Sequence, residues 1–393
     1  MAREGCSRLP MGAVLLLAVA MGGPAMALTV SATDVQRFTV YHSPSTPGYT
    51  CWAGTWVMPD GTLMVSFHQA TGPFTGRPLA PPAVRAAMNW PPTGLSAGYD
   101  MTGTIQEIIH LASSDAGQTW RQVSAQPYHS PMNGCTCMAE SALPDGTLIR
   151  AVLGQYLPFH DVPQTGYVQR STDLGATWSA PEPIMAAADR SAYPVRLRVL
   201  RDGRVAVSGA VIPMAPGAGC REDWMKVMQP ALWVSSDGGH TFGEPVIVLP
   251  HQDGITNTEE CDFAELSDGS LVFVLRSDVP ERRRWQSVLE PAGDTYRLAS
   301  WGPCPIAPTG CPEMLFAREG VALHIASSDI RWTDDKGATW HDLGIGGTGY
   351  YPRSVQLPDG RIFCVFHRGS DDPYDGSVDQ EIQGMTFRLV VEQ

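Results

Sequence analysis

The chain has 393 residues, of which 43% are hydrophobic and 17% are charged, and its formal net charge is −13. This composition is that of a globular protein and excludes a largely disordered chain. The acidic balance repels phosphate backbones, so we expect no nucleic acid partner.

The N-terminus has the features of a secretory signal peptide. Arg3 and Arg8 supply positive charge, a short apolar run follows, and an A-x-A cleavage site ends at Ala27. The apolar run is about half of the ~20 residues that cross a bilayer, so we expect no membrane span. We therefore expect residues 1–27 to be a signal peptide and residues 28–393 to form a secreted or periplasmic protein.

One turn motif, S/T-x-D-x-G-x-T-W/F, recurs four times. Its copies span residues 113–120, 171–178, 235–242 and 333–340. In such a turn the Asp accepts backbone N–H bonds, the Gly adopts a positive φ, and the aromatic residue packs between sheets. The four copies, called Asp boxes below, predict four hairpins of one kind.

A second turn motif, D/E-G before an apolar strand, alternates with the Asp boxes. Its six copies are Asp60-Gly61, Asp145-Gly146, Asp202-Gly203, Asp268-Gly269, Glu319-Gly320 and Asp359-Gly360. Asp-Gly between apolar runs predicts a β-hairpin. One hairpin of each kind makes a four-stranded antiparallel blade, so six D-G turns predict six blades, with seven as the alternative count.

The predicted fold class is therefore all-β, a six-bladed β-propeller with Asp-box hairpins. We expect one domain over residues 28–393, because no long amphipathic helix pattern interrupts the repeats. The stretch after Asp268 lacks an Asp box. The last blade needs a closing strand from the N-terminal side, which we place near residues 38–41.

Equivalent positions in the repeats predict which side chains line the central channel. The innermost strand of each blade faces that channel, and ligands bind at one of its ends. Three fixed offsets from the D-G glycine, which assume strands without bulges, place polar or aromatic side chains there. These residues are Trp52, His68, Arg196, Glu260, Asp262, Arg276, Tyr351, Arg353 and His367.

The Asp boxes, the blade count and the export signal together resemble the sialidase (neuraminidase) superfamily over nearly the whole chain. Glu260, followed by E-L-x-D-G and then Arg276, is similar to the family segment in which a Glu activates a tyrosine and an Arg binds the sialic acid carboxylate. The segment that contains Tyr350 and Tyr351 is similar to the one with the nucleophilic tyrosine. Tyr351 fits the spacing best, and Tyr350 is one residue away.

The resemblance implies that Tyr351 is the nucleophile and Glu260 its base. A neutral phenol, unlike a carboxylate, is not repelled by a substrate that carries its own carboxylate. The general acid of the family lies on an early loop. Asp100 is the candidate here, because it is the sole Asp or Glu between residues 71 and 104. The expected sugar-contacting residues are Arg276, Arg353, Arg196, His68, His367 and Tyr350, with no cofactor and no metal.

The chain departs from the family pattern at the substrate carboxylate, which three arginines bind in the family. The first position falls in residues 49–54, which contain no arginine, and the third falls at Cys311-Pro312-Glu313-Met314. Arg196 and Arg353 are the candidate substitutes. Each lost charge-assisted contact weakens binding by roughly 1.5–3 kcal/mol.

Three functions from different classes therefore stay open. The first is a secreted, exo-acting glycoside hydrolase that removes a terminal, acidic, sialic-acid-like sugar from a glycan. The second is a polysaccharide lyase in which His68 or His367 acts with a tyrosine on a uronate, and its unsaturated product absorbs ultraviolet light. The third is a non-catalytic carbohydrate-binding propeller. The sequence does not indicate an oligomeric state.

The cysteines predict disulfides. Of nine cysteines, Cys6 leaves with the signal peptide, and an even number in an exported protein favours pairing. Cys304 and Cys311 flank a Pro-rich loop and are the pair we expect to be bridged. Cys135 and Cys137 are too close in sequence for an ordinary zinc pair, and no CxxC or HxxxH accompanies them.

Overall fold

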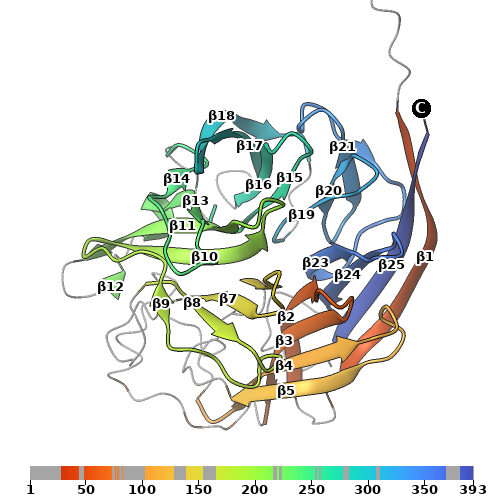
Figure 1. The fold of residues 1–393 in the computed structure, drawn as a ribbon, viewed down its shortest axis with the longest axis horizontal. Helices are drawn as coiled ribbons and strands as arrows, with labels where there is room; N and C mark the ends of the chain where they lie inside the picture. Colours follow the sequence, from red (N-terminus) through yellow and green to blue (C-terminus); the bar gives the residue numbers. More distant parts are fainter. Residues whose placement is uncertain are drawn as a thin grey trace, which may run out of the picture.

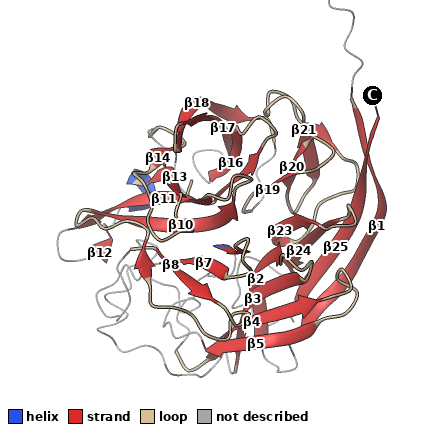
Figure 2. Ribbon diagram, in the orientation of Figure 1, coloured by secondary structure: helices blue, strands red, loops and turns tan. Residues whose placement is uncertain are grey.

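A computed structural model of the chain describes residues 28–43, 48–72, 76, 78, 82, 102–127, 139–153, 165–215, 219–220, 224–252, 255, 258–277, 283–306, 310–368 and 381–392. Its sheets are arranged as blades around a central axis (Figure 1). Strands dominate the described part, and α2 (Trp224–Val227) is a single helical turn (Figure 2). No helix of the described residues is long and apolar enough to cross a membrane.

The first three blades follow one another along the chain. Blade 1 contains β2 (Gly48–Val57), β3 (Leu63–Thr71), β4 (Ile105–Ser113) and β5 (Arg121–Pro127). Blade 2 contains β6 (Glu140–Ala142), β7 (Leu148–Val152), β8 (Tyr167–Ser171) and β9 (Glu182–Pro183). Blade 3 contains β10 (Arg190–Val199), β11 (Val205–Ala215), β13 (Gln229–Ser235) and β14 (Val246–Ile247), with β12 (Gly219–Cys220) paired to β11.

The last three blades complete the disc. Blade 4 contains β15 (Cys261–Glu265), β16 (Leu271–Ser277), β17 (Arg283–Ala292) and β18 (Thr295–Cys304). Blade 5 contains β19 (Glu313–Phe316), β20 (Ala322–Ile325), β21 (Ile330–Thr333) and β22 (His341–Asp342). Blade 6 contains β23 (Tyr350–Gln356), β24 (Ile362–His367), β25 (Glu381–Glu392) and β1 (Thr29–His42).

The first strands of the blades form a closed inner ring. Each of β2, β6, β10, β15, β19 and β23 contacts the first strand of the next blade, and β23 returns to β2. The six-bladed architecture predicted from the D-G turns is therefore confirmed. Because these strands run the same way through the disc, the residues at their N-terminal ends gather at one end of the channel.

The ring closes through pairing of the two ends of the described chain. β1 lies antiparallel to β25, from Thr29 opposite Glu392 to His42 opposite Glu381. The predicted closing strand is confirmed and is longer than residues 38–41. Phe38 lies over Gly384, where a Cβ atom would come within 2.6 Å of its ring, so this position needs a glycine.

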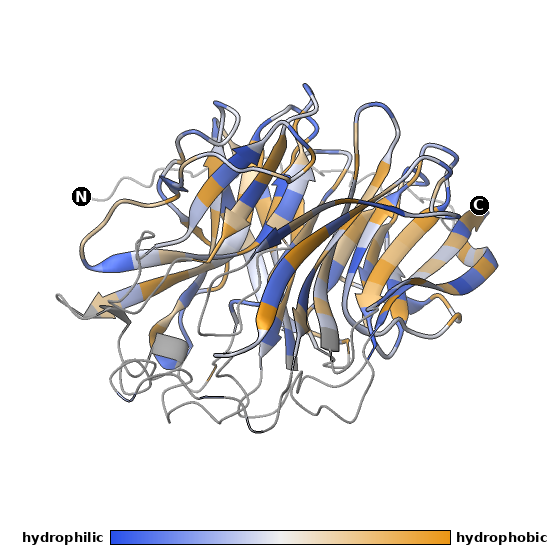
Figure 3. Cartoon of the chain, turned by 90° about the horizontal axis from the view of Figure 1, so that it is seen from below, coloured by the Kyte–Doolittle hydropathy of each residue, from blue (hydrophilic) through white to orange (hydrophobic). Residues whose placement is uncertain are grey.

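A hydrophobic cluster fills each of the six blade junctions. In the junction of blades 6 and 1, for example, Phe67 and Leu63 pack with Phe363 and Val365. Strands buried on both faces supply these residues, which is why apolar runs rather than strict alternation mark them in the sequence. Figure 3 shows the disc edge-on, with many hydrophobic residues in the strands.

All six D-G turns form as predicted. Each glycine has a positive φ, between 81° and 90°. At the first turn Gly61 N–H donates to the carbonyl of Met58, and Thr62 N–H donates to Asp60 Oδ1 at 2.9 Å. The degenerate copy at Gly320 makes the equivalent bond to Ala317. The aspartate is therefore replaceable, whereas the left-handed glycine is common to all copies.

The Asp boxes also have their predicted hydrogen bonds. Asp115 Oδ1 accepts from Ser113 Oγ at 2.7 Å and from Thr119 N–H at 2.9 Å, and Asp115 Oδ2 accepts from Thr119 Oγ1. These bonds, chiefly those from Thr119, lower the pKa of Asp115 to about 2. Gly117 has φ 91°, and the residue before it, Ala116, is also left-handed at 58°.

Each Asp box packs against the preceding blade. Trp120 of blade 1 contacts Phe363 of blade 6, and Trp340 of blade 5 donates its indole N–H to Gln286 of blade 4. In blade 4 the β17–β18 hairpin turns at residues 293–294 without an Asp box, as the sequence predicts. The motif therefore joins blades as well as strands.

The predicted disulfide between Cys304 and Cys311 is wrong. Both cysteines are free and buried. Cys304 ends β18, the outermost strand of blade 4, whereas Cys311 lies just before β19, an innermost strand, where Arg196 Nη2 approaches its Sγ at 3.1 Å. The short loop in sequence therefore joins the outside of one blade to the inside of the next. Cys135 and Cys137 lie outside the described residues.

The Asp box of blade 5 predicts a measurable contribution to stability. Asp335 accepts bonds from Thr333 Oγ1, Thr339 N–H and Thr339 Oγ1 at 2.7, 2.9 and 2.6 Å. Asp335→Ala removes the acceptor for all three, so we expect a loss of about 1–3 kcal/mol in the free energy of unfolding, measured in urea. The matched control is the exposed neighbour variant Asp334→Ala, and equal losses in both variants contradict this role.

Three buried histidines predict acid sensitivity. Burial lowers the pKa of His68 to about 4, that of His367 to about 3, and that of His324 well below its usual value. The unfolded chain binds protons near pH 6.5 while the folded chain does not, so acidification from pH 6.5 towards 4 favours unfolding. Each such group contributes about 1.4 kcal/mol per pH unit in that window.

His324→Leu tests this expectation, because both ring nitrogens of His324 are buried without a hydrogen-bond partner. We expect the variant to be at least as stable as the wild type at pH 7 and to lose less stability between pH 7 and pH 5. His240→Leu, at a side chain 59% exposed, is the control. An unchanged pH slope in the His324 variant would show that this histidine binds protons in the folded state.

Candidate functional site

The candidate site lies where the innermost strands of blades 4 and 6 begin. Glu260 directly precedes β15, and its carbonyl accepts the N–H of Arg276, at the end of β16, at 2.9 Å. Tyr350 and Tyr351 open β23. Because the inner strands share one direction, these starting points lie at the same end of the channel.

A β-bulge sets the direction of Tyr351. Tyr350 pairs with His367 and Arg353 pairs with Val365, so two residues of β23 lie opposite one residue of β24. Tyr351 is one of the two and has φ 50°. A bulky residue in this left-handed region costs roughly 1–3 kcal/mol, and such strain is typical of functional sites.

The side chains of Tyr351, Glu260 and Arg276 meet. Tyr351 Oη donates to Glu260 Oε1 at 2.7 Å, and Arg276 Nη1 donates to Glu260 Oε2 at 2.6 Å and to Tyr351 Oη at 3.4 Å. The side chains of Glu260 and Arg276 are 16% and 17% exposed. A phenol therefore lies against a carboxylate that a guanidinium orients, which is the arrangement of a nucleophile with its base.

The spacing assumption that pointed to Tyr351 holds only in part. Blade 4 has no bulge here, so Glu260 lies opposite Arg276, and the residue of blade 6 in the same register is Tyr350, opposite His367. Tyr350 instead stacks on His367, with ring centroids 6.0 Å apart. The bulge moves the next residue, Tyr351, onto Glu260.

His367 and His68 are placed behind the site and are neutral. His367 is buried, stacks on Tyr351 with centroids 5.7 Å apart, and accepts the backbone N–H of Trp52 on Nδ1 at 3.2 Å. His68 is buried and stacks on Trp52. Because desolvation dominates both, neither ring carries a charge at neutral pH.

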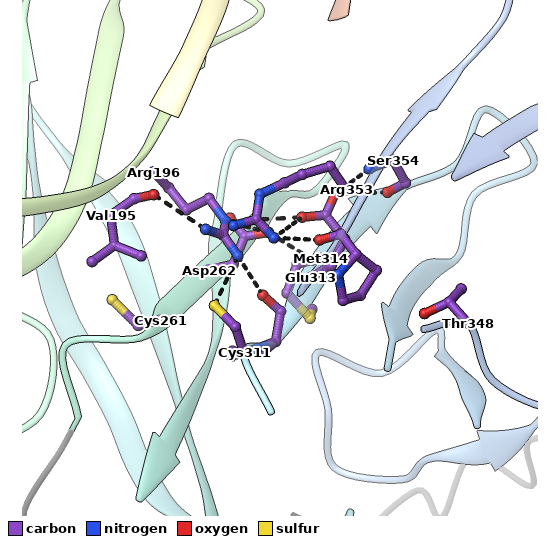
Figure 4. A network of polar contacts seen from close by, with 12 residues as sticks. Val195, Arg196, Cys261, Asp262, Cys311, Glu313, Met314, Thr348, Arg353 and Ser354 are labelled. Carbon is purple, nitrogen blue, oxygen red and sulfur yellow. Dashed lines mark hydrogen bonds and ion pairs between the residues drawn. The ribbon is translucent and has the colours of Figure 1, made fainter. Parts of the chain in front are cut away.

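Arg196 and Arg353, which the sequence predicts to contact the sugar, are buried. Their side chains are 2% and 5% exposed and face Glu313 inside the disc, at 3.8 and 3.9 Å. The reason is the pair of buried carboxylates, Asp262 and Glu313, on the neighbouring inner strands. Figure 4 shows the two guanidinium groups lying against these carboxylates.

The buried charges form one axial network. Arg198 Nη2 donates to Asp262 Oδ2 at 2.5 Å and to the carbonyl of Met314 at 2.6 Å. Glu313 Oε1 accepts from both the N–H and the hydroxyl of Ser354, at 2.8 and 2.7 Å. The network therefore joins β10, β15, β19 and β23, the inner strands of four consecutive blades.

The pKa values of the two carboxylates in this network are shifted in opposite directions. Burial acts to raise the pKa of Asp262, but Arg198 and Arg196 outweigh it and hold that pKa below its usual value. Burial and the charge of Asp262 raise the pKa of Glu313. The sequence analysis did not predict a role for Arg198. Arg198 lies two residues after Arg196 on one strand, so both side chains lie on the same face of that strand.

A second polar arrangement lies between blades 1 and 2. His110 contacts Ser124 Oγ at Nδ1, at 2.9 Å, and Glu140 at Nε2, at 3.1 Å. These are residue types of a hydrolytic triad, but all three are buried, and Ser124 Oγ also donates to the carbonyl of Leu174. A Cβ on Gly175 would come within 2.7 Å of the imidazole, so the arrangement fills the blade junction.

Asp100, the candidate general acid, lies outside the described residues, as does most of the loop that carries it. No group of three or more metal-ligating side chains occurs among the residues that the structure describes.

Solved structures of other proteins share this fold at low sequence identity. No family model matches the sequence, and no curated protein matches it. A protein of unknown function from Dyadobacter fermentans has 17% identity and a TM-score of 0.62, covering 92% of this chain and 99% of that one. An α-L-arabinanase from Penicillium chrysogenum has 13% identity and a TM-score of 0.59, covering 89% and 97%.

A microbial sialidase from a Hadza source has 15% identity and a TM-score of 0.54, covering 90% of this chain and 68% of that one. At these identities the likeness shows a shared propeller fold. It does not single out the sialidases, because arabinanase and sialidase structures match about equally well.

The axial network predicts a large stability loss when one partner is removed. Asp262→Asn leaves Arg198 and Arg196 without their main counter-charge in a buried site, so we expect a loss of about 3–5 kcal/mol in urea unfolding. The control is Arg190→Ala, which breaks the exposed Arg190–Glu244 pair and should change stability by less than about 1 kcal/mol. Equal losses of stability in the two variants contradict this role of the axial network.

Proposed function

We propose that this protein is a glycoside hydrolase of the sialidase type, with Tyr351 as nucleophile and Glu260 as its base, that removes a terminal acidic sugar from a glycan. The observation that supports this proposal is the 2.7 Å hydrogen bond from Tyr351 Oη to Glu260 Oε1. Solved neighbours named as arabinanase, arabinofuranosidase and sialidase fit a glycan-acting hydrolase in general.

In the first step the phenolic proton passes from Tyr351 Oη to Glu260 Oε1 as the phenolate oxygen attacks the anomeric carbon. The bond from Tyr351 to the sugar forms, and the bond to the leaving oxygen breaks. That oxygen takes a proton from a general acid, for which Asp100 is the candidate. In the second step water attacks the anomeric carbon and gives one proton to the carboxylate that the general acid has become, while the bond to Tyr351 breaks and the phenolate recovers its proton from Glu260. Two inverting displacements retain the anomeric configuration.

The charges around Tyr351 favour an acidic substrate during this step. In the resting site Glu260 and Arg276 neutralise each other across 2.6 Å. When Glu260 accepts the phenolic proton and the phenolate oxygen bonds to the sugar, both groups that Arg276 contacts become neutral. A carboxylate of the sugar beside Arg276 is then bound more strongly in the transition state than in the ground state, which lowers the barrier.

The lyase alternative is less well supported by the surroundings of His367. A lyase needs a basic nitrogen that faces the sugar, but His367 Nδ1 accepts the N–H of Trp52, so in the neutral ring the proton resides on Nε2. At Nε2 such an imidazole donates a hydrogen bond and has no lone pair with which to accept a proton. The non-catalytic alternative predicts sugar binding without turnover.

Tyr351→Phe tests the proposal on 4-methylumbelliferyl glycosides of sialic and hexuronic acids. We expect release of 4-methylumbelliferone by the wild type, and a kcat/KM at least about 100-fold lower in Tyr351→Phe and in Glu260→Gln, because the nucleophile or its base is lost. Tyr350→Phe is the matched control and should retain most activity.

Equal release by wild type and Tyr351→Phe contradicts the proposal. Formation of an ultraviolet-absorbing, unsaturated product in place of a free reducing sugar supports the lyase instead. Sugar binding without any release by the wild type supports the non-catalytic propeller.

A further inference from the structure

Trp52 stands in blade 1 where Tyr351 stands in blade 6. In β2, Cys51 pairs with His68 and Gly54 pairs with Ser66, so Trp52 lies in a bulge that matches the bulge of β23. Its φ is 50°, the same value as that of Tyr351. Two large aromatic residues in left-handed conformation on adjacent inner strands, β2 and β23, are thus aimed by the same backbone device.

The Trp52 ring packs against a buried histidine. His68, which is 1% exposed, stacks against it with centroids 6.0 Å apart and an interplanar angle of 10°. Trp52 itself is half-buried. Because one face of the indole lies against a buried imidazole, the exposed part of the ring lies on the side away from His68.

Trp52 also borders the reacting groups. Its backbone N–H donates to His367 Nδ1. Tyr351 stacks on the same imidazole, with ring centroids 5.7 Å apart. An indole that is rigidly held beside a nucleophile is suited to stack on the C–H face of a sugar ring, since it combines a large apolar surface with little rotamer freedom to lose.

We propose that Trp52 is a specificity-determining residue that stacks on the ring of the sugar being cleaved. This inference rests on the proposed function. It names the substrate class as a terminal sugar with one carboxylate, recognised by one guanidinium, Arg276, and by an aromatic platform. Three arginines on the inner strands, Arg196, Arg198 and Arg353, pair with Asp262 and Glu313.

Binding to the inactive Tyr351→Phe protein tests the proposal separately from catalysis. The probes are the methyl glycosides of N-acetylneuraminic acid, glucuronic acid and glucose, followed by saturation-transfer NMR and titration. Trp52→Gly is added to remove the ring, and glycine adopts φ 50° without strain, so the fold is kept. Trp52→Phe restores an aromatic ring, and Trp301→Ala, on the exposed outer strand β18, is the control.

We expect Trp52→Gly to weaken binding of the acidic glycosides about tenfold, Trp52→Phe to stay within about threefold of the parent, and Trp301→Ala to have no effect. Ring protons of the bound sugar should receive the strongest saturation. The inference is overturned if Trp52→Gly binds within twofold of the parent, if Gly and Phe variants are equally impaired, or if no probe binds.

The failure of this inference and that of the proposed function give different results. If sugar binding depends on Trp52 but the wild type releases no product, the hydrolase proposal fails and the role of Trp52 in binding stands. If turnover depends on Tyr351 but not on Trp52, the role of Trp52 fails and the hydrolase proposal stands.

Discussion

The axial network of buried charges is the constraint on which the candidate site depends. Asp262 lies two residues after Glu260 on one inner strand, and Arg353 lies two residues after Tyr351 on another. Glu313 and Asp262 both pair with Arg196, which joins blades 4 and 5 to blade 3, and Glu313 also accepts from Ser354, which joins blade 6. The network therefore sets the separation of the two strands that hold the carboxylate and the phenol, and the 2.7 Å contact between them follows from it.

The network also explains why the site differs from a pocket with several free arginines. Moving a guanidinium into a low-dielectric interior is unfavourable unless a carboxylate accompanies it. Asp262 and Glu313 are the carboxylates that accompany the buried arginines inside the disc, and Glu260 is the carboxylate that accompanies Arg276 at the end of the channel. The channel thus holds its cations as pairs. Proton transfer from Tyr351 to Glu260 moves the negative charge onto the phenolate oxygen, and that charge is lost when the oxygen bonds to the sugar.

Local chemistry made much of the fold predictable from sequence. The D-G turns and Asp boxes are each fixed within a few residues, by a left-handed glycine and by an aspartate that accepts neighbouring donors, so six blades and their hairpins could be counted. The pairing of Glu260 with Tyr351 was predictable for the same reason, since both sit at fixed distances from such turns.

The remaining features depend on partners that are distant in sequence. The bulges at Trp52 and Tyr351 insert one residue against a neighbouring strand and leave no mark in composition, so the offsets, which assume strands without bulges, favoured Tyr351 although Tyr350 is the residue in the register of Glu260. The burial of Arg196 and Arg353 depends on carboxylates from other blades. The free state of Cys304 and Cys311 depends on the radial positions of β18 and β19.

The most direct test of the account is to identify the covalent intermediate on the enzyme. Purified protein is mixed with an activated aryl glycoside of an acidic sugar, quenched in acid within the first turnover, digested, and analysed by mass spectrometry. The account predicts that the peptide containing Tyr351 gains the mass of one sugar residue through the phenolic oxygen. An adduct on an Asp or Glu side chain, or continued product formation with no adduct on Tyr351, would contradict it.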